Sequence, residues 1–329
     1  MTPEKIQKSL KHNFGFNTFQ AEQEKIVKTV LKNQDCLVLM PTGGGKSLCY
    51  QLPATLLPGV TIVVSPLIAL MKDQVEGLIE NGIDANFLNS SLDQTETREV
   101  EEAVLEGKIK LLYVSPEKLV SSSFQNFLKQ IKISLFAIDE AHCISSWGHD
   151  FRKEYTQLGT IKNRFPDVPV IALTATADKI TRKDIVRQLH LKNPRIFISS
   201  FDRPNLELTV LPAQKRLQAI INFVKKRKND SGIIYCLSRK QTEKVASALQ
   251  QENISASYYH AGLDSHTRSK TQENFIHGRT QIIVATIAFG MGIDKSNVRF
   301  VIHHNLPKNI EGYYQEIGRA GRDGLPSET

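Results

Sequence analysis

Short apolar runs recur along the chain, each followed by a polar turn and then by a segment with the periodicity of an amphipathic helix. Runs of about four to six apolar, often β-branched residues are typical of strands that are buried on both faces of a sheet. Because these runs alternate with helical segments, we predict βαβ units and therefore parallel sheets. The expected strands span residues 36–40, 60–64, 110–114, 135–139, 168–173, 232–236, 256–259, 281–285 and 299–303.

The expected strands fall into two series with a break between them. Pro204 and the Ser, Asp and Asn residues around it interrupt any regular element at 199–205. We therefore predict two tandem α/β domains, at 1–202 and 203–329, each with a mainly parallel sheet flanked by helices. Ligands of such sheets bind outside the carboxyl ends of the strands, so functional residues are expected directly after the apolar runs.

Composition places the chain among ordinary globular proteins, with 40% hydrophobic and 23% charged residues. No apolar run approaches the about 20 residues that span a bilayer, and the N-terminus lacks the apolar stretch of a signal peptide. We therefore expect no membrane association. The four cysteines are scattered without a C-x-x-C pair, so neither a zinc site nor a disulfide framework is expected.

The net charge of +8 favours an anionic partner, and the excess of Lys and Arg is concentrated after residue 200. A basic half of this kind fits nucleic acid, and it equally fits a solvated surface. Charge alone therefore leaves the class of partner open.

A glycine-rich loop, Pro41-Thr-Gly-Gly-Gly-Lys-Ser47, follows the expected strand at 36–40 and precedes a helical segment. Glycines let backbone N–H groups turn toward phosphate oxygens, and the start of the helix adds its dipole. In this pattern Lys46 reaches the β- and γ-phosphates and Ser47 binds Mg²⁺. Met40 stands where the strict pattern has its first glycine. The loop predicts a phosphate site made by Thr42, Gly43, Gly44, Gly45, Lys46 and Ser47.

A pair of acids, Asp139 and Glu140, ends the expected strand at 135–139. The first carboxylate is expected to hold Mg²⁺, and the second to orient or deprotonate the attacking water. Such a pair is common at strand ends, but together with the lysine loop it indicates a Mg²⁺-dependent NTPase.

Several longer strings, in the same order along the chain, resemble the RecQ family of superfamily 2 DNA helicases. They are PTGGGKSLCYQLP at 41–53, AHCISSWGHDFR at 141–152, ALTATA at 172–177, FDRPNL at 201–206, VATIAFGMGIDK at 284–295 and YYQEIGRAGRDG at 313–324. The resemblance covers nearly the whole chain. It implies two tandem RecA-like domains with an ATP cleft between them.

The resemblance also implies further nucleotide contacts. Gln23 would recognise adenine, since a Gln amide offers the base one donor and one acceptor. Phe16 could stack on the base, and Asp294 belongs to a nucleotide-contacting string. Gln20 stands where the family usually has Arg, which removes or weakens one contact. Without the resemblance, the segment around Gln23 is an ordinary start of an amphipathic helix.

Two arginines, Arg319 and Arg322, lie in a Gly-containing string near the end of the second domain. By resemblance they complete the ATP site across the interdomain cleft. An arginine that stabilises charge on the transferring phosphate contributes about 10³–10⁵ in rate. We predict Arg322 as the arginine finger, supported by Arg319. The alternative is two surface arginines beside Glu316 and Asp323.

The loop after the acid pair matches the aromatic-rich loop of RecQ proteins. Trp147 and Phe151 can stack on unpaired bases, with His149 nearby, and Arg152 can contact phosphate. The alternative is that the aromatic residues anchor the loop to the core. Thr174 and Thr176 are expected to couple ATP to DNA. Backbone contacts to DNA are expected at the strand-end residues Ser65, Ser238, Arg239, His260 and Thr286.

These features predict an ATP-dependent DNA helicase motor, and the resemblance implies that it moves 3′ to 5′ on single-stranded DNA and serves repair or recombination. The expected partners are ATP, Mg²⁺ and single-stranded or forked DNA, and the expected state is a monomer in the cytoplasm, at the bacterial nucleoid or in the nucleus. The family's zinc, winged-helix and HRDC-type modules are absent from the sequence, so weak unwinding is expected. The alternatives are an RNA helicase of the DEAD/DEAH group and a non-catalytic, nucleotide-gated binding module.

Overall fold

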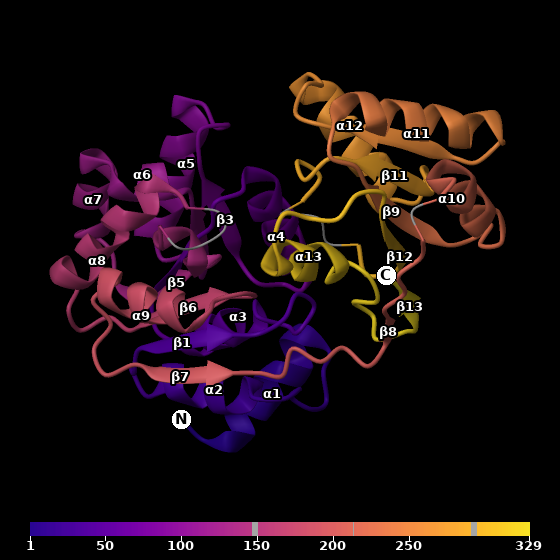
Figure 1. The fold of residues 1–329 in the computed structure, drawn as a ribbon. Helices are drawn as coiled ribbons and strands as arrows, with labels where there is room; N and C mark the ends of the chain where they lie inside the picture. Colours follow the sequence, from indigo (N-terminus) through magenta and orange to yellow (C-terminus); the bar gives the residue numbers. More distant parts are fainter. Residues whose placement is uncertain (147–150, 213, 291–294) are drawn as a thin grey trace. The chain divides into compact units, whose positions relative to one another are not determined.

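Two parallel β-sheets, each covered by helices, organise the chain, as the alternation of apolar runs and helical segments predicts (Figure 1). The computed structural model describes residues 1–146, 151–212, 214–290 and 295–329. These residues divide into two compact units, Met1–Phe201 and Asp202–Thr329. The predicted fold class is therefore confirmed.

The first unit contains a seven-stranded sheet in the order β3-β4-β2-β5-β6-β1-β7, with every neighbouring pair parallel. Its strands are β1 (Cys36–Leu39), β2 (Val60–Val64), β3 (Ala85–Leu88), β4 (Leu111–Val114), β5 (Ile133–Ile138), β6 (Val170–Thr174) and β7 (Arg195–Ile198). Its α-helices are α1 (Pro3–Phe14), α2 (Gln23–Leu31), α3 (Leu48–Leu56), α4 (Ile68–Glu80), α5 (Gln94–Leu105), α6 (Pro116–Val120), α7 (Ser122–Leu128), α8 (Gly159–Arg164) and α9 (Lys179–Gln188). Two 3₁₀ helices, Ala141–Ile144 and Lys153–Leu158, follow the acid pair.

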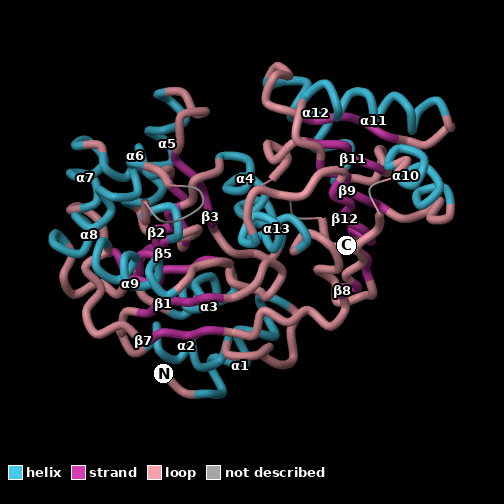
Figure 2. The backbone as a smooth tube through the Cα atoms, viewed as in Figure 1, coloured by secondary structure: helices cyan, strands magenta, loops and turns pink. Residues whose placement is uncertain are grey.

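The second unit contains a six-stranded parallel sheet in the order β10-β11-β9-β12-β13-β8 (Figure 2). Its strands are β8 (Leu206–Glu207), β9 (Ser231–Tyr235), β10 (Ala256–Tyr259), β11 (Ile282–Ala285), β12 (Val298–His303) and β13 (Ser327–Glu328). Its helices are α10 (Arg216–Lys225), α11 (Arg239–Gln251), α12 (Ser265–Ile276) and α13 (Ile310–Ile317). In the part of the chain that is described, no helix has the length and apolar character needed to cross a membrane.

The core explains why the central strands are continuously apolar. Along β1, Leu37 and Leu39 pack into one buried cluster, while Cys36 and Val38 pack into another. A strand covered by helices on both faces has no solvent-facing position, so alternation disappears and only an apolar run remains. Each of the nine strands predicted from such runs is present, with ends that differ by at most two residues.

Four strands were not predicted: β3, β7, β8 and β13. The strands β3 and β7 lie at the two edges of the first sheet, and β8 lies at an edge of the second. Their polar and exposed positions, such as Asn86 on β3 and Arg195 on β7, break the apolar run. β8 and β13 span two residues each, too few to show a pattern.

A buried ion pair holds the amino ends of the strands in the first unit. Lys162 Nζ lies 2.8 Å from Asp35 Oδ1, and both side chains are buried. The Asp35 carboxylate also accepts hydrogen bonds from the backbone N–H groups of Val170 and Lys192. One side chain thus joins the start of β1 to α8, to β6 and to the turn before β7.

Replacing the cation of this pair should destabilise the first unit. Lys162→Met keeps the aliphatic volume but leaves the Asp35 carboxylate without its charge partner, which costs about 3–5 kcal/mol. Urea unfolding followed by the fluorescence of Trp147, the only tryptophan of the chain, measures the change. The control is Lys28→Met, which removes an exposed pair with Glu24 and should cost about 0.5 kcal/mol or less. Equal losses in the two variants would contradict the prediction.

Candidate functional site

The glycine-rich loop joins the carboxyl end of β1 to the amino end of α3. Gly43 and Gly45 have φ angles of +79° and +74°, a region that residues with a Cβ avoid. Lys46 Nζ donates hydrogen bonds to the carbonyl oxygens of Met40 and Pro41, at 3.2 and 3.3 Å. Met40, which stands where the strict glycine-rich pattern has its first glycine, packs its side chain into the buried core. The ammonium group is thus held over the loop by neutral acceptors, which an anionic ligand can replace.

Gln23 is packed against this loop, and its side chain is only 3% exposed. Its Nε2 donates to the carbonyl oxygens of Gly44 and Gly45, both at 3.3 Å, and its Oε1 accepts from Gln20 N at 2.8 Å. A Cβ at Gly45 would lie 2.3 Å from Gln23 Nε2, so the close packing requires glycine there. The amide that the sequence predicts for adenine is therefore engaged with the phosphate loop. Phe16 is 51% exposed, and Gln20 is exposed as well.

The acid pair follows β5 at the same edge of the sheet. Glu140 has φ +48° and ψ +45°, a left-handed conformation that non-glycine residues seldom adopt and that is often found at functional sites. Glu140 N donates to Asp139 Oδ1 at 3.0 Å. Burial, together with the negative charge of Glu140, raises the pKa of Asp139 from 3.8 to about 7, although Lys46 counteracts this. Burial and the neighbouring carboxylate therefore disfavour the ionised form of Asp139, which a bound cation would favour.

Buried hydrogen bonds connect His142, two residues beyond the acid pair, to β6. His142 Nδ1 lies 2.9 Å from Thr174 Oγ1 and 3.3 Å from Glu140 Oε2. The Thr174 hydroxyl donates its single proton to Thr176 O, so we assign His142 Nδ1–H as the donor to Thr174. Thr174 O in turn accepts from Met40 N at 3.1 Å, at the start of the phosphate loop. Thr174 thus links the two halves of the nucleotide site.

The segment after the acid pair is anchored at both ends. Ser145 Oγ donates to Asp184 on α9 at 2.8 Å. Arg152 Nη1 donates to Pro66 O at 3.0 Å, and the Tyr155 hydroxyl donates to Asp139 O at 3.0 Å. Trp147 and His149 lie outside the described residues. Phe151 is 47% exposed and so is available for contact with a ligand.

Ser65, at the end of β2, is buried, and its Oγ has no hydrogen-bond partner in the described part of the chain. A buried hydroxyl without a partner loses free energy, so a ligand that supplies one is favoured. Thr176 Oγ1 is also buried without a hydrogen-bond partner among the described residues. Both atoms lie at the carboxyl ends of strands, where ligands of parallel sheets bind.

In the second unit, the predicted DNA contacts lie at the carboxyl ends of the adjacent strands β10, β11 and β9. Ser238 caps α11 by accepting from Gln241 N, and Arg239 is exposed beside Gly262. His260 is buried with Nε2 3.1 Å from Glu243 Oε1, and its Nδ1 has no partner among the described residues. Thr286, which follows β11, is half-buried.

The two arginines follow α13 and differ in burial. Arg319 is only 5% exposed, and its Nε has no partner in the described residues. The hydrogen bond from Arg319 opposes the effect of burial on Tyr235, whose pKa is raised to about 12. Arg322 is half-buried. Asp294 lies outside the described residues.

The structure brings together the loop residues, Gln23, the acid pair and Thr174 in the first unit, and it groups the two arginines in the second. Sequence reasoning assigned no role to Tyr155, Asp184 or His142, because a hydrogen bond between distant segments leaves no periodic signal. The string at 201–206 was noted only for its resemblance, although it contacts the arginine segment.

The geometry defines a class: a phosphate loop and an acid strand end on a parallel α/β sheet, followed by a second α/β unit with paired arginines. Family comparison agrees with this class. The family described as DEAD/DEAH box helicase matches residues 20–185, and the helicase conserved C-terminal domain matches residues 215–324.

Curated relatives narrow the class. The ATP-dependent DNA helicase RecQ of Pasteurella multocida is 54% identical over 96% of this chain and 50% of the relative. RecQ of Bacillus subtilis is 45% identical over 98% of this chain and 55% of the relative. The chain belongs to the RecQ family of superfamily 2 helicases. It spans about half the length of these relatives.

Solved structures support the fold. Mss116p, in a structure bound to ssRNA and AMP-PNP, has a TM-score of 0.79 at 18% identity, covering 99% of this chain and 72% of that chain. Saccharomyces cerevisiae Dbp5, bound to RNA and ADP BeF3, has a TM-score of 0.75 at 18% identity, covering 100% and 86%. Both contain RecA-like helicase cores, so the likeness extends to the two-sheet architecture.

The raised pKa of Asp139 predicts a pH-dependent stability in the absence of metal. Its folded pKa of about 7 lies above its ordinary 3.8, so the free energy of unfolding falls as the pH rises through this interval. Asp139→Asn removes the free-energy cost of keeping this buried carboxylate ionised. The substitution should stabilise the first unit at pH 8 by up to about 4 kcal/mol, with a smaller gain at pH 5. Urea unfolding in EDTA measures both.

The control is Asp178→Asn, at a carboxylate whose pKa is lowered by hydrogen bonds from Thr181. Loss of the Asp178 carboxylate should decrease the free energy of unfolding at pH 8 or leave it unchanged. A metal-free Asp139→Asn protein that is less stable than the wild type at pH 8 would refute the assignment.

Proposed function

We propose that this chain is the ATP-hydrolysing motor of a DNA helicase, which couples hydrolysis to 3′-to-5′ movement on single-stranded DNA. The observation that carries the proposal is Thr174 at one sheet edge, which is hydrogen-bonded both to His142, two residues beyond the acid pair, and to Met40 at the start of the phosphate loop. Membership of the RecQ family supports DNA as the track. A role in repair or recombination is part of the same proposal.

ATP is the proposed substrate of the glycine-rich loop. Thr42 and the N–H groups of Gly43, Gly44 and Gly45 would surround its phosphates, and Lys46 would exchange its carbonyl partners for the β- and γ-phosphate oxygens. Gln23 would turn its amide to adenine, with Phe16 against the base and Asp294 as a further contact. Gln20, which carries no charge, would contribute less than the arginine usual in the family.

Ser47 and Asp139 are the residues that would hold Mg²⁺. Their hydroxyl and carboxylate oxygens are hard ligands of the kind Mg²⁺ prefers, and a cation would stabilise the ionised form of Asp139, which burial disfavours. Bound Mg²⁺ supplies positive charge that offsets the charge of the phosphates.

Glu140 is the proposed base for the hydrolytic water. As water attacks the γ-phosphorus and the bond to ADP breaks, a proton passes from water to the Glu140 carboxylate. The left-handed backbone of Glu140 and its contact with His142 fix the direction of this carboxylate. Arg319 and Arg322 would stabilise the charge on the transferring phosphate, with Arg322 as the finger. The observation that supports this role is the buried guanidinium of Arg319, whose Nε has no partner in the described residues.

Single-stranded DNA is the proposed activator. Trp147, His149, Phe151 and Arg152 belong to the loop that leads directly from the acid pair, so a base stacked there would act on Glu140 through a short connection. Ser65, Ser238, Arg239, His260 and Thr286 would contact the backbone of the strand without reading bases. Thr174 and Thr176 would couple the two events.

A monomer acting on single-stranded and forked DNA, in the cytoplasm or at the chromosome, completes the proposal. The relatives named as helicases are about twice as long as this chain. As a separate part of the proposal, these 329 residues by themselves act as a strong DNA-stimulated ATPase with weak unwinding activity.

The decisive measurement is ATP turnover with single-stranded DNA, with single-stranded RNA and without nucleic acid, beside an unwinding assay on a forked duplex. DNA should raise the rate well above the other two conditions. Lys46→Ala should abolish turnover, because the loop loses the cation that meets the β- and γ-phosphates.

Each rival has its own outcome. Equal or greater stimulation by RNA would favour an RNA helicase of the DEAD/DEAH group. Absence of turnover with excess DNA would favour a nucleotide-gated binding module. Efficient unwinding by this chain would refute the weak-unwinding proposal and leave the ATPase proposal intact.

A further inference from the structure

The backbone between the two arginines is held by residues from the string at 201–206. Arg203 Nη2 donates to Ala320 O at 3.1 Å and to Gly321 O at 2.8 Å. Asn205 Nδ2 donates to Gly321 O at 2.9 Å and to Leu325 O at 3.0 Å. The carbonyl oxygens of the only two residues between Arg319 and Arg322 are thus both acceptors of this pair of side chains.

Gly321 makes the arrangement sterically tight. Its φ is +57°, and a Cβ there would lie 2.4 Å from Asn205 Nδ2 and 2.9 Å from Ser327 Oγ. Its N–H donates to Val298 O at 2.9 Å. The peptide between the arginines is therefore fixed on one side by β12 and on the other by Arg203 and Asn205.

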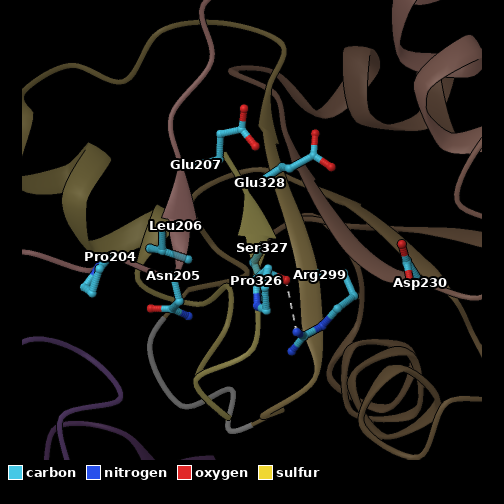
Figure 3. A pocket seen from close by; sticks show the side chains of 9 residues that line it. All are labelled: Pro204, Asn205, Leu206, Glu207, Asp230, Arg299, Pro326, Ser327 and Glu328. Carbon is cyan, nitrogen blue, oxygen red and sulfur yellow. Dashed lines mark hydrogen bonds between the residues drawn. The ribbon is translucent and has the colours of Figure 1, made fainter.

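The donors are themselves fixed. Leu206 N donates to Arg203 O, and Ser327 N donates to Asn205 O at 2.9 Å. β8, which begins directly after Asn205, pairs with β13 (Figure 3). Arg203 Nε also approaches Asn205 Oδ1 at 3.4 Å, so the two side chains orient each other.

We propose that Arg203 and Asn205 are positioning residues for Arg319 and Arg322. The inference rests on the proposed function, in which these arginines act on the phosphate during hydrolysis. A guanidinium on a long side chain is directed by the backbone from which it starts, and small displacements at a reacting centre cost about 10²-fold in rate. In this proposal Arg203 and Asn205 act on the arginines through the carbonyl oxygens of Ala320 and Gly321.

The test is steady-state ATP hydrolysis with saturating single-stranded DNA by the variants Asn205→Ala, Asn205→Asp, Arg203→Ala and Arg203→Lys. Asn205→Asp keeps the shape but replaces the donor by a carboxylate that faces carbonyl oxygens, so its kcat should fall most, by about 10–100-fold. The kcat of Asn205→Ala should fall less than that of Asn205→Asp. Arg203→Lys keeps a cationic donor and should retain part of the activity lost in Arg203→Ala. KM for ATP and the affinity for DNA should stay within about twofold of wild type in each variant.

The matched control is Arg299→Ala. Arg299 lies in the same unit and contacts the segment beyond Gly321 through Asp323 and Pro326 O, but no carbonyl oxygen between the arginines (Figure 3). Its kcat should remain near wild type. Thermal unfolding of every variant separates loss of the fold from loss of positioning.

The outcomes separate cleanly. A selective fall in kcat, with an unchanged melting temperature and partial activity in Arg203→Lys, supports the inference. An unchanged kcat in Asn205→Asp overturns it, and so does an equal fall in kcat in Arg299→Ala. It is also overturned if Arg203→Lys and Asn205→Ala lose activity only because they lose the fold. If the wild-type chain itself does not hydrolyse ATP with DNA, it is the proposed function that fails.

Discussion

The constraint on which the rest of the structure depends is the burial of each parallel sheet on both faces. Strands such as β1, β2 and β6 have no exposed position, so a polar side chain can be solvated only where a strand ends. Every candidate residue of the first unit that follows a strand obeys this rule, from Lys46 after β1 to Asp139 after β5. The chemistry is concentrated at one edge because the core leaves no other place for it.

At that edge, neutral hydrogen bonds compensate the charged groups only in part. Lys46 is held by carbonyl oxygens, and the pKa of Asp139 is raised by burial and by Glu140. Thr174 joins the two by bonding to His142 on one side and to Met40 on the other. One threonine therefore ties the segment after the acid pair to the start of the phosphate loop.

The anchored segments show a common principle of positioning. Tyr155 fixes the chain after the aromatic-rich loop by bonding to Asp139 O, and Arg203 fixes the arginine segment by bonding to Ala320 O and Gly321 O. In each case the acceptor is a backbone carbonyl of, or next to, a candidate functional residue, so the donor restrains the backbone from which that side chain starts.

The two-unit α/β class, nine strands and the phosphate loop with its acid pair are predictable from the amino-acid sequence, because they depend on local periodicity and on short motifs. The strands β3 and β7 are not, because their edge positions tolerate polar residues such as Asn86 and Arg195. The contact of the Gln23 amide with the phosphate loop, the bond from Arg152 to Pro66 O and the bond from Asn205 to Gly321 O are visible in the folded chain alone. Partners of this kind are separated by about 20 to 120 residues in the chain, and hydrogen bonds over such separations depend on the tertiary fold within each unit, which no local pattern records.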